Sequence, residues 1–354
     1  MSNISFSDAQ PLFTKKVVAK YADRVRPLTF GRSFFKETES DTKEISIEVQ
    51  RGYEKMAVDV TRGTVGNRNS FDLSTEKIFI PPFFREYFDV TELAVYDALL
   101  QSASVTPALF GRFIQTVADK MSVLTDKIDR AYEKQAWDVF QTGIVSLEKG
   151  TNIDFKRKSA SILNVSALSG RAWTVANNAT CTPYTDFTTG CEFIRKVGLT
   201  DSTVFNAILG GDALAAFLAL PQVQSRNDIK NYNLDMINSP IVNGLGGVFH
   251  GEISAGSYRL RLWTYPQFYT NSAGVSTPYL DPETVVILPE NPAMVLSYAA
   301  VPQLFQNGVQ PVKGKFIFGD YIDERASAHV FDVKSAGVCI PVGVDQIYTM
   351  KVLV

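Results

Sequence analysis

Side chains that could carry out chemistry are few in this sequence and lie far apart. The two histidines, His250 in a glycine-rich loop and His329 in a strand-like run, have no adjacent ligand or acid that would complete a metal site or a catalytic pair. The three cysteines, Cys181, Cys191 and Cys339, lack the paired spacing of a zinc site. An odd number of cysteines in a long chain is typical of a reducing compartment, which disfavours a disulfide between Cys181 and Cys191.

Two glycine-containing segments share only part of the pattern of a nucleotide-binding loop. The GLGG segment at 244–247 lacks the preceding strand and following helix of a dinucleotide-binding loop, so we interpret it as a turn. The segment from Gly308 to Lys315 is one residue too long for a phosphate-binding loop, and no serine or threonine follows its lysine. The sequence therefore predicts no bound cofactor.

A charged cluster near the C-terminus is the remaining candidate for chemistry. It consists of Asp320, Asp323, Glu324 and Arg325. Carboxylates beside an arginine can act as an acid and a base, but an ion pair between strands or between subunits is the simpler interpretation. The metal-binding, catalytic and nucleotide-binding patterns are also incomplete, so the sequence favours a protein that is not an enzyme. The alternative is a catalytic site whose residues are scattered along the chain.

Composition excludes two further classes of protein. The chain has 354 residues, of which 45% are hydrophobic and 20% charged, so it can bury one large core or two modest ones. Its formal net charge is -2 at pH 7, whereas a dedicated nucleic-acid binder is normally basic. No apolar run reaches 18 residues, so the sequence predicts no membrane-spanning helix.

The strongest structural pattern is one long amphipathic helix over 107–142. Thr106 and Pro107 form a typical helix start, and Gly143 can adopt the left-handed conformation that ends a helix. Such a helix is about 50 Å long, far above the average for globular proteins. Its apolar stripe consists of Phe110, Ile114, Val117, Met121, Leu124 and Ile128. Its opposite, solvated face is predicted to carry Asp119, Lys120, Asp126, Lys127, Asp129, Arg130, Glu133 and Lys134.

The segments before this helix read as an arm and a ribbon. Residues 1–36 hold seven lysines and arginines against two acids, which fits either a solvated tail or an arm that docks on an acidic neighbour. Apolar residues alternate over 45–49 and 56–60, with a turn at 51–54, and a third strand over 77–80 ends at two prolines. A ribbon of two or three strands is not stable alone, so it must lie on the body of its own chain or on another subunit.

The rest of the chain reads as a mixture of helices and strands. A short helix is predicted over 91–101, a strand over 153–158, a helix over 187–197, a strand over 203–209 and a helix over 213–223. Further strands are predicted at 259–263, 284–288, 315–322, 326–333, 337–341 and 346–354.

Four blocks of the sequence resemble, in the same order, the lambda-type major capsid protein family (protein E), whose capsid fold is named after phage Hong Kong 97. They are PLTFGRSFFKE at 27–37, the segment from Ser74 to Pro82, the segment from Tyr265 to Leu288, and the C-terminal residues 323–354. The likeness covers nearly the whole chain and is weakest over 144–240.

This resemblance implies an α+β phage capsid fold with five parts. Residues 1–36 would be an N-terminal arm and residues 37–90 an extended loop formed by a β-hairpin. Residues 91–185 would form a peripheral domain built on the spine helix 107–142, and residues 186–300 an axial domain. Residues 301–354 would be strands that complete the peripheral and axial domains.

The resemblance also implies a function and partners. The chain would be a major capsid protein of a tailed phage or prophage that assembles into an icosahedral shell of hexamers and pentamers around double-stranded DNA, without sequence-specific binding. Its partners would be other copies, a scaffolding protein, a portal and a decoration protein, and assembly in the bacterial host cytoplasm would end in the virion. The alternatives are the shell of an encapsulin-like compartment and, from another class, an unrecognised soluble enzyme.

The arm, the ribbon and the C-terminal cluster supply the candidate contacts between subunits. The arm arginines are expected to pair with acids of an adjacent copy, the ribbon arginines to contact neighbours and the apolar residues to anchor the base of the ribbon. The candidates are Arg24, Arg26 and Arg32 in the arm, Arg51, Arg62 and Arg68 in the ribbon, Phe79, Ile80, Phe83 and Phe84 at its base, and Asp323, Glu324 and Arg325 near the C-terminus.

Overall fold

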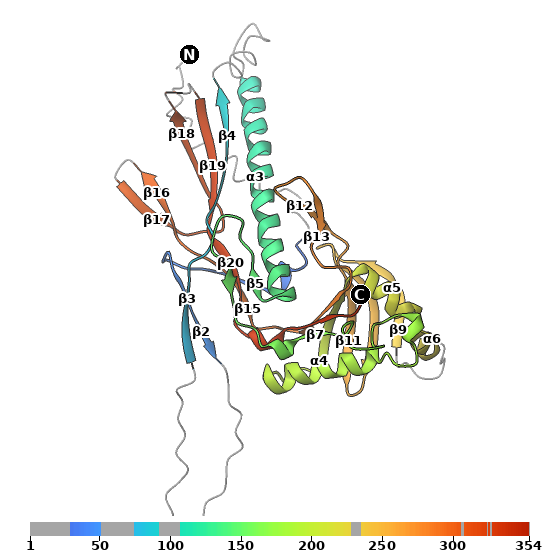
Figure 1. Cartoon of the computed structure of the whole chain (residues 1–354). Helices are drawn as coiled ribbons and strands as arrows, with labels where there is room; N and C mark the ends of the chain where they lie inside the picture. The colour runs from blue at the N-terminus through green and yellow to red at the C-terminus, as the bar shows by residue number, and fades with distance from the viewer. Residues whose placement is uncertain are drawn as a thin grey trace, which may run out of the picture.

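The long helix predicted from the sequence is the longest element of the fold. It is α3, Pro107–Gln141, and it runs along the body between a group of long strands and the rest of the chain (Figure 1). The fold comes from a computed structural model, in which residues 29–50, 74–91, 107–227, 235–305, 308–323, 325 and 328–353 are described. The other helices are α4 (Pro183–Val197), α5 (Gly211–Ala219) and α6 (Pro221–Asn227), with short 3-10 turns η1 (Arg32–Phe34), η2 (Ser159–Ser161), η3 (Val175–Asn177) and η4 (Val344–Gln346).

The apolar stripe of α3 is confirmed wherever its side chains are described. Val117, Met121, Leu124 and Ile128 are all buried, as the alternating spacing of three and four residues requires. The end of the helix is also confirmed, because Gly143 has a φ of 74° and its amide donates to the Val139 carbonyl at 3.0 Å. Thr106 and the side chains of Phe110 and Ile114 lie outside the described residues.

Two three-stranded sheets pack along α3. Toward the N-terminal end of the helix lies the antiparallel sheet β18 (Ile317–Asp323), β19 (Ala328–Ser335) and β4 (Phe84–Thr91), in that order. Toward its C-terminal end lies the sheet β1 (Lys36–Glu39), β15 (Met294–Tyr298) and β20 (Gly337–Pro341). Because β1 pairs in parallel with β15, the segment that follows the arm is an integral strand of the body.

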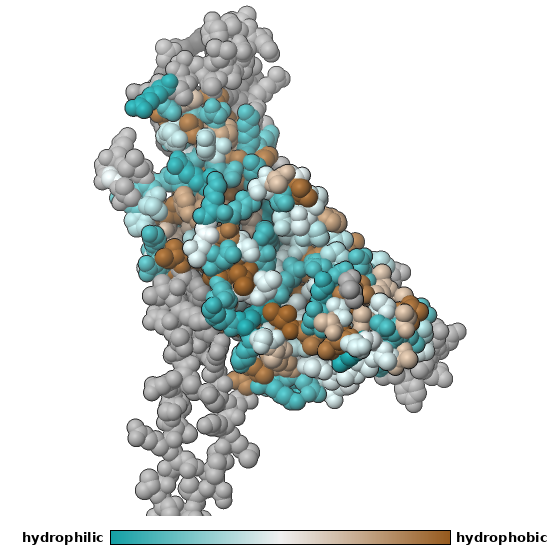
Figure 2. Space-filling model, viewed as in Figure 1, coloured by the Kyte–Doolittle hydropathy of each residue, from teal (hydrophilic) through white to brown (hydrophobic). Residues whose placement is uncertain are grey.

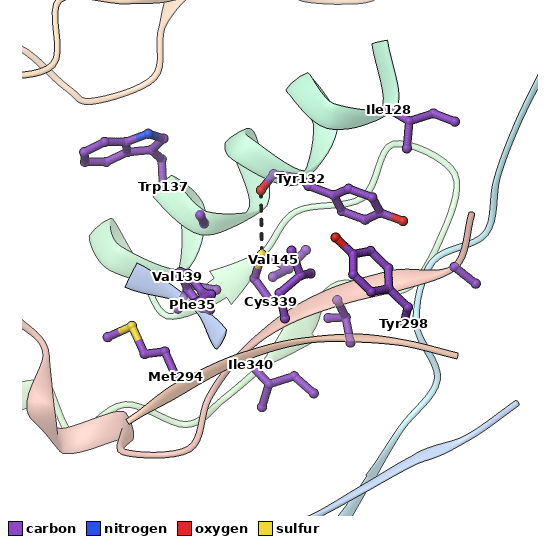
Figure 3. Close-up of a cluster of buried hydrophobic side chains, with 14 of the residues drawn as sticks. Phe35, Ile128, Tyr132, Trp137, Val139, Val145, Met294, Tyr298, Cys339 and Ile340 are labelled. Carbon is purple, nitrogen blue, oxygen red and sulfur yellow. Dashed lines mark hydrogen bonds between the residues drawn. The ribbon is translucent and has the colours of Figure 1, made fainter. Parts of the chain in front are cut away.

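The main hydrophobic core lies between α3 and these strands (Figure 3). Tyr132 and Trp137 of α3 are almost fully buried there, together with Tyr298 of β15. The rings of Tyr132 and Tyr298 meet edge to face, with centroids 5.6 Å apart. The Cys339 thiol lies 3.6 Å from the Tyr132 carbonyl, so β20 passes directly against the helix backbone.

A seven-stranded sheet forms the other end of the body. Its strand order is β7 (Ile162–Asn164), β21 (Tyr348–Lys351), β14 (Thr284–Pro289), β8 (Val204–Leu209), β11 (Tyr258–Thr264), β10 (Val248–Ala255) and β9 (Asp235–Val242). The pairs β11–β8 and β21–β7 are parallel and the others antiparallel. A second core, centred on Trp173, Phe187 and Phe217, lies between this sheet and the helices α4 and α5.

Four two-stranded ribbons complete the described part of the chain. They are β2 (Ile45–Gln50) with β3 (Ser74–Phe79), β5 (Ile144–Val145) with β6 (Ile153–Asp154), β12 (Phe268–Thr270) with β13 (Ser276–Pro278), and β16 (Val301–Phe305) with β17 (Gly308–Val312). The β2–β3 ribbon extends away from the body in the opposite direction to β4 and β19 (Figure 1). It contains the predicted strands over 45–49 and 77–80, whereas the predicted turn at 51–54, the strand over 56–60 and the helix over 91–101 lie outside the described residues.

Several sequence predictions need correction. The strand predicted over 153–158 ends at Asp154, because Lys156 has a φ of 56° and turns the chain inward. The helix predicted over 213–223 is two helices, since Pro221 cannot continue α5 and instead begins α6. His250, predicted in a loop, lies in β10 and its Nε2 is 2.8 Å from the Thr264 hydroxyl.

The junction between β8 and α5 allows a sharp test of the packing. A Cβ atom at Gly210 would lie 2.3 Å from the Pro282 carbonyl oxygen and 2.4 Å from that of Asp281, whereas nothing lies within 4 Å of one at Gly211. We expect Gly210→Ala to lower the free energy of unfolding by about 1–3 kcal/mol, because backbone atoms must move. Gly211→Ala is the matched control, and it should be neutral or stabilise by up to about 1 kcal/mol. Equal urea midpoints for the two variants would contradict this packing.

Candidate functional site

The first described residues hold the base of the arm against α3. The amides of Gly31 and Arg32 donate to the two carboxylate oxygens of Glu133, at 2.7 and 3.0 Å. The Trp137 indole N–H donates to the same carboxylate at 2.9 Å. Three donors from two segments therefore converge on one buried acid, which fixes the place where the arm leaves the body.

A buried ion pair reinforces this attachment. The Arg32 guanidinium binds the Asp129 carboxylate, and it lies 3.5 Å from Glu37. Burial by itself would lower the pKa of Arg32, but the charge and hydrogen bond of Asp129 together with Tyr298 and Glu37 outweigh it, so the pKa lies above its usual value. Lys315 adds a second positive charge, 3.1 Å from Glu37 and 3.7 Å from Asp129.

The acid at the centre of the attachment is strongly desolvated. Burial raises the pKa of Glu133, and its hydrogen bonds from Gly31, Arg32 and Trp137 act in the opposite direction. Because the carboxylate is buried, each of these donors is needed to replace water. We call Phe30, Gly31, Arg32, Asp129 and Glu133 the arm clamp.

Aromatic rings enclose the clamp on the side of the seven-stranded sheet. The Phe30 ring lies 5.3 Å from Trp263 and 5.8 Å from Tyr265, and Tyr265 stacks on Trp137 at 5.1 Å. A Cβ at Gly247 would lie 2.6 Å from the Phe30 ring, so the GLGG turn between β9 and β10 packs closely on the same residue. The base of the arm is therefore held by α3 and by the sheet together.

The clamp corrects two sequence predictions. Asp129 and Glu133, predicted on the solvated face of the helix, are 1% and 0% exposed because the arm crosses that face. Arg32, predicted to pair with an acid of an adjacent copy, is instead paired with an acid of its own chain. Asp119, Lys120, Lys127 and Arg130 do lie exposed, as predicted for the opposite face.

The base of the ribbon is anchored by fewer residues than predicted. The Phe84 ring packs edge to face on Tyr132, with centroids 5.4 Å apart. Ile80 and Phe83 are 60% and 54% exposed, so neither anchors the ribbon within its own chain. The backbone of Phe79 pairs with Ile45, and its side chain lies outside the described residues.

The predicted charged cluster does not form one constellation. Asp320 lies 3.0 Å from the Nε2 of His329, across the β18–β19 pair. Asp323 lies on the opposite face of β18, since strand side chains alternate, and it accepts the Arg325 amide at 3.0 Å. The remaining candidates, Arg24, Arg26, Arg51, Arg62, Arg68 and Glu324, lie outside the described residues.

The described residues offer no other centre of chemistry. Cys181, Cys191 and Cys339 are buried as free thiols. Within the described ranges, no three histidines, cysteines or acids come together as metal ligands do. No helix in that part of the chain is long and apolar enough to cross a membrane. On the face in Figure 2, hydrophobic side chains are interspersed with hydrophilic ones.

Comparison with known proteins decides the family. A sequence model described as phage major capsid protein E matches residues 17–321, which is most of the chain. This chain belongs to the phage major capsid protein E family. It is a structural protein of a phage capsid, and so of the virion, that assembles into multimeric shells, and it is not an enzyme. No curated protein matches the sequence.

Two solved structures show the same fold at low sequence identity, and a third has a weaker likeness. A putative capsid protein of a prophage from E. coli CFT073 is 16% identical, covering 99% of this chain and 100% of that chain, with a TM-score of 0.63. A phage-related protein from Bordetella bronchiseptica RB50 is 11% identical, covering 95% and 96%, with a TM-score of 0.53. The holo-SrpI encapsulin complex from Synechococcus elongatus PCC 7942 is 11% identical and covers 100% and 96%, with a TM-score of 0.46.

The capsid fold predicted from the sequence is therefore confirmed. Three residues that hold the fold together were not predicted from the sequence: Asp129 and Glu133, which bind the base of the arm, and Arg157. The Arg157 guanidinium donates to the Phe140 carbonyl at 2.8 Å and to the Thr349 hydroxyl at 3.1 Å, which ties the end of α3 to β21. Apolar and polar residues alternate over 153–156, which places Arg157 on the side of Ile153 and Phe155, and this was the one local sign that the arginine turns inward.

Proposed function

We propose that this capsid protein builds the icosahedral shell of a tailed phage or prophage, as hexamers and pentamers that enclose double-stranded DNA. The observation that carries the proposal is the family match over residues 17–321. The near-neutral net charge of -2 suits a container for DNA, since a strongly basic wall would hold phosphates tightly by counterion release.

In this proposal α3 is the spine of a peripheral domain, and the seven-stranded sheet with α4 and α5 forms most of an axial domain. The β2–β3 ribbon is part of an extended loop that lies over a neighbouring subunit. Support comes from its isolation, because within the described residues it pairs with no third strand. A two-stranded ribbon gains stability by packing on another surface.

The same shell function implies contacts between copies and with other proteins of the shell. Arg24 and Arg26 of the arm and Arg51, Arg62 and Arg68 of the loop would contact acids of adjacent copies. Asp323, Glu324 and Arg325 would form ion pairs with residues of opposite charge on adjacent copies. Phe83 would complete the contact made by the loop. A separate scaffolding protein would guide assembly in the host cytoplasm, a portal would occupy one vertex, and a decoration protein would bind outside.

Electron microscopy with sedimentation tests this function. The chain would be expressed alone and together with the genes that flank it, which supply a scaffolding protein where one is needed. We expect shells, tubes or rings of megadalton mass, and shells from the phage should contain DNA. A monodisperse monomer or dimer under both conditions would contradict the proposal, and shells filled with enzyme cargo would favour the encapsulin-like compartment.

A further inference from the structure

The β16–β17 hairpin lacks charged residues, and its place in the fold does not explain this lack. It forms a two-stranded sheet of its own within the described part of the chain, and it stands out from the body beside β18 (Figure 1). No charged residue occurs from Val301 to Val312, although 20% of the chain is charged. Depletion of charge is typical of the centre of a protein–protein interface.

The base of this hairpin is firmly held. Val301 is completely buried in the main core, and Val312 packs against the same core. The Lys334 ammonium donates to the Gln303 side-chain oxygen at 3.3 Å. Lys313 pairs with Asp41 at 3.0 Å. These contacts come from three different segments, so the hairpin presents a fixed face to its surroundings.

Its register places two prolines opposite each other. Pro302 pairs with Pro311, between the pairs Val301–Val312 and Gln303–Gln310. Proline has no N–H, so this pair must occupy a position where the backbone groups point outward from the ribbon. Side chains alternate, so the prolines project from the face opposite to Val301 and Gln303. Because Val301 and Gln303 contact the body, the proline face points away from it, and both prolines are exposed.

The same prolines remove backbone donors from both edges of the hairpin. Outward N–H groups belong to alternate residues, which are 302 and 304 on β16 and 309 and 311 on β17. Proline therefore removes one of the two outward donors on each edge. Such an edge resists the addition of a further strand. A partner must bind through the side chains of the proline face.

The sheet formed by β18, β19 and β4 carries exposed aromatic side chains on which the proline face could pack. Tyr87 of β4 and Tyr321 of β18 are 64% and 46% exposed. Tyr87 is opposite Asp332 and Tyr321 is opposite Val330, two residues apart on β19, so both tyrosines lie on one face of the sheet. This face points away from α3, because Phe88 and Phe331 on the other face pack in the main core with that helix. A proline ring is apolar and rigid, and exposed aromatic rings offer apolar area of the kind that is enriched at protein interfaces. The prolines and the tyrosines are both exposed, so they do not cover one another within one chain.

We propose that the Pro302–Pro311 face of the β16–β17 hairpin docks on Tyr87 and Tyr321 of a second copy of this chain. The proposal rests on the shell-forming function above. Each copy gives a hairpin and receives another, which is a heterologous contact of the kind that propagates through a closed assembly. The hairpin enters it by side-chain packing, because its edges resist the addition of a strand.

Crosslinking in assembled particles tests this contact. The double variant Pro311→Cys/Tyr87→Cys is assembled, treated with a short bis-maleimide and analysed on a denaturing gel. The three native cysteines are buried, so they leave little background. The matched control is Pro311→Cys/Phe268→Cys, since Phe268 of β12 is 63% exposed and belongs to another part of the fold. Tyr321→Cys replaces Tyr87→Cys where that variant fails to assemble.

We expect dimers and larger crosslinked species from the Tyr87 or Tyr321 pair and monomers from the Phe268 pair. Equal crosslinking of test and control pairs, or a crosslink confined to single chains, would overturn the proposed contact. If the proposed shell function were wrong, the wild-type chain itself would form no particles, and this result differs from the loss of a crosslink. Particles without the crosslink leave the shell function standing and remove this interface.

Discussion

Replacing Arg32 with methionine is expected to lower the free energy of unfolding of the unassembled subunit by about 3–5 kcal/mol. The guanidinium is the only group that binds the Asp129 carboxylate at hydrogen-bond distance among the described contacts, since Lys315 lies 3.7 Å away. Methionine fills similar space but leaves that carboxylate buried without its cation. The charge then cannot regain water, because Asp129 is 1% exposed.

Urea unfolding followed by fluorescence measures this loss of stability. Two further variants show whether it comes from the unpaired charge. The double variant Arg32→Met/Asp129→Leu should recover most of the stability, because an apolar pair can replace a buried ion pair at little cost. Lys196→Met is the control for an ordinary surface pair with Glu192 and should change nothing measurable. An Arg32→Met variant as stable as the wild type would show that the clamp does not hold the arm.

The arm clamp contains contacts that local sequence patterns cannot predict. The spacing of apolar residues predicted α3 and its buried stripe, because a helix repeats its faces over a few residues. The same spacing placed Glu133 in solvent, since nothing local indicates that Gly31, 102 positions earlier, crosses that face. Charged residues of a helix face are solvated by default, and only a contact distant in sequence reverses that expectation.

The ribbons show a second limit of the same kind. The alternation over 45–49 and 77–80 predicted strands, and the register of β2 with β3 agrees with them. The Pro302–Pro311 hairpin escaped prediction because prolines lower β-propensity, although at outward positions they do not interrupt a two-stranded ladder. Which position of a pair points outward depends on register, and register is a property of both strands together.

Closing the extended loop with a two-residue turn is expected to abolish assembly while leaving the subunit folded. Gln50 of β2 and Ser74 of β3 form the outermost pair of the described part of the ribbon, so replacing 51–73 with Asn-Gly joins them as a tight hairpin. The described cores should survive, because the ribbon meets the body through Ile45 at its base and pairs with no third strand there.

Sedimentation and electron microscopy would measure the loss of shells, with circular dichroism as the check on folding. The matched control replaces 51–73 with a glycine–serine segment of equal length, which keeps the reach of the loop and removes its side chains. If contacts made by the loop drive assembly, both variants remain unassembled, whereas a loop that acts only as a spacer would let the glycine–serine variant form shells. Normal shells from the closed hairpin would refute the role of the loop, because a two-stranded ribbon that ends at Gln50 and Ser74 has too little length left to cross onto a neighbour.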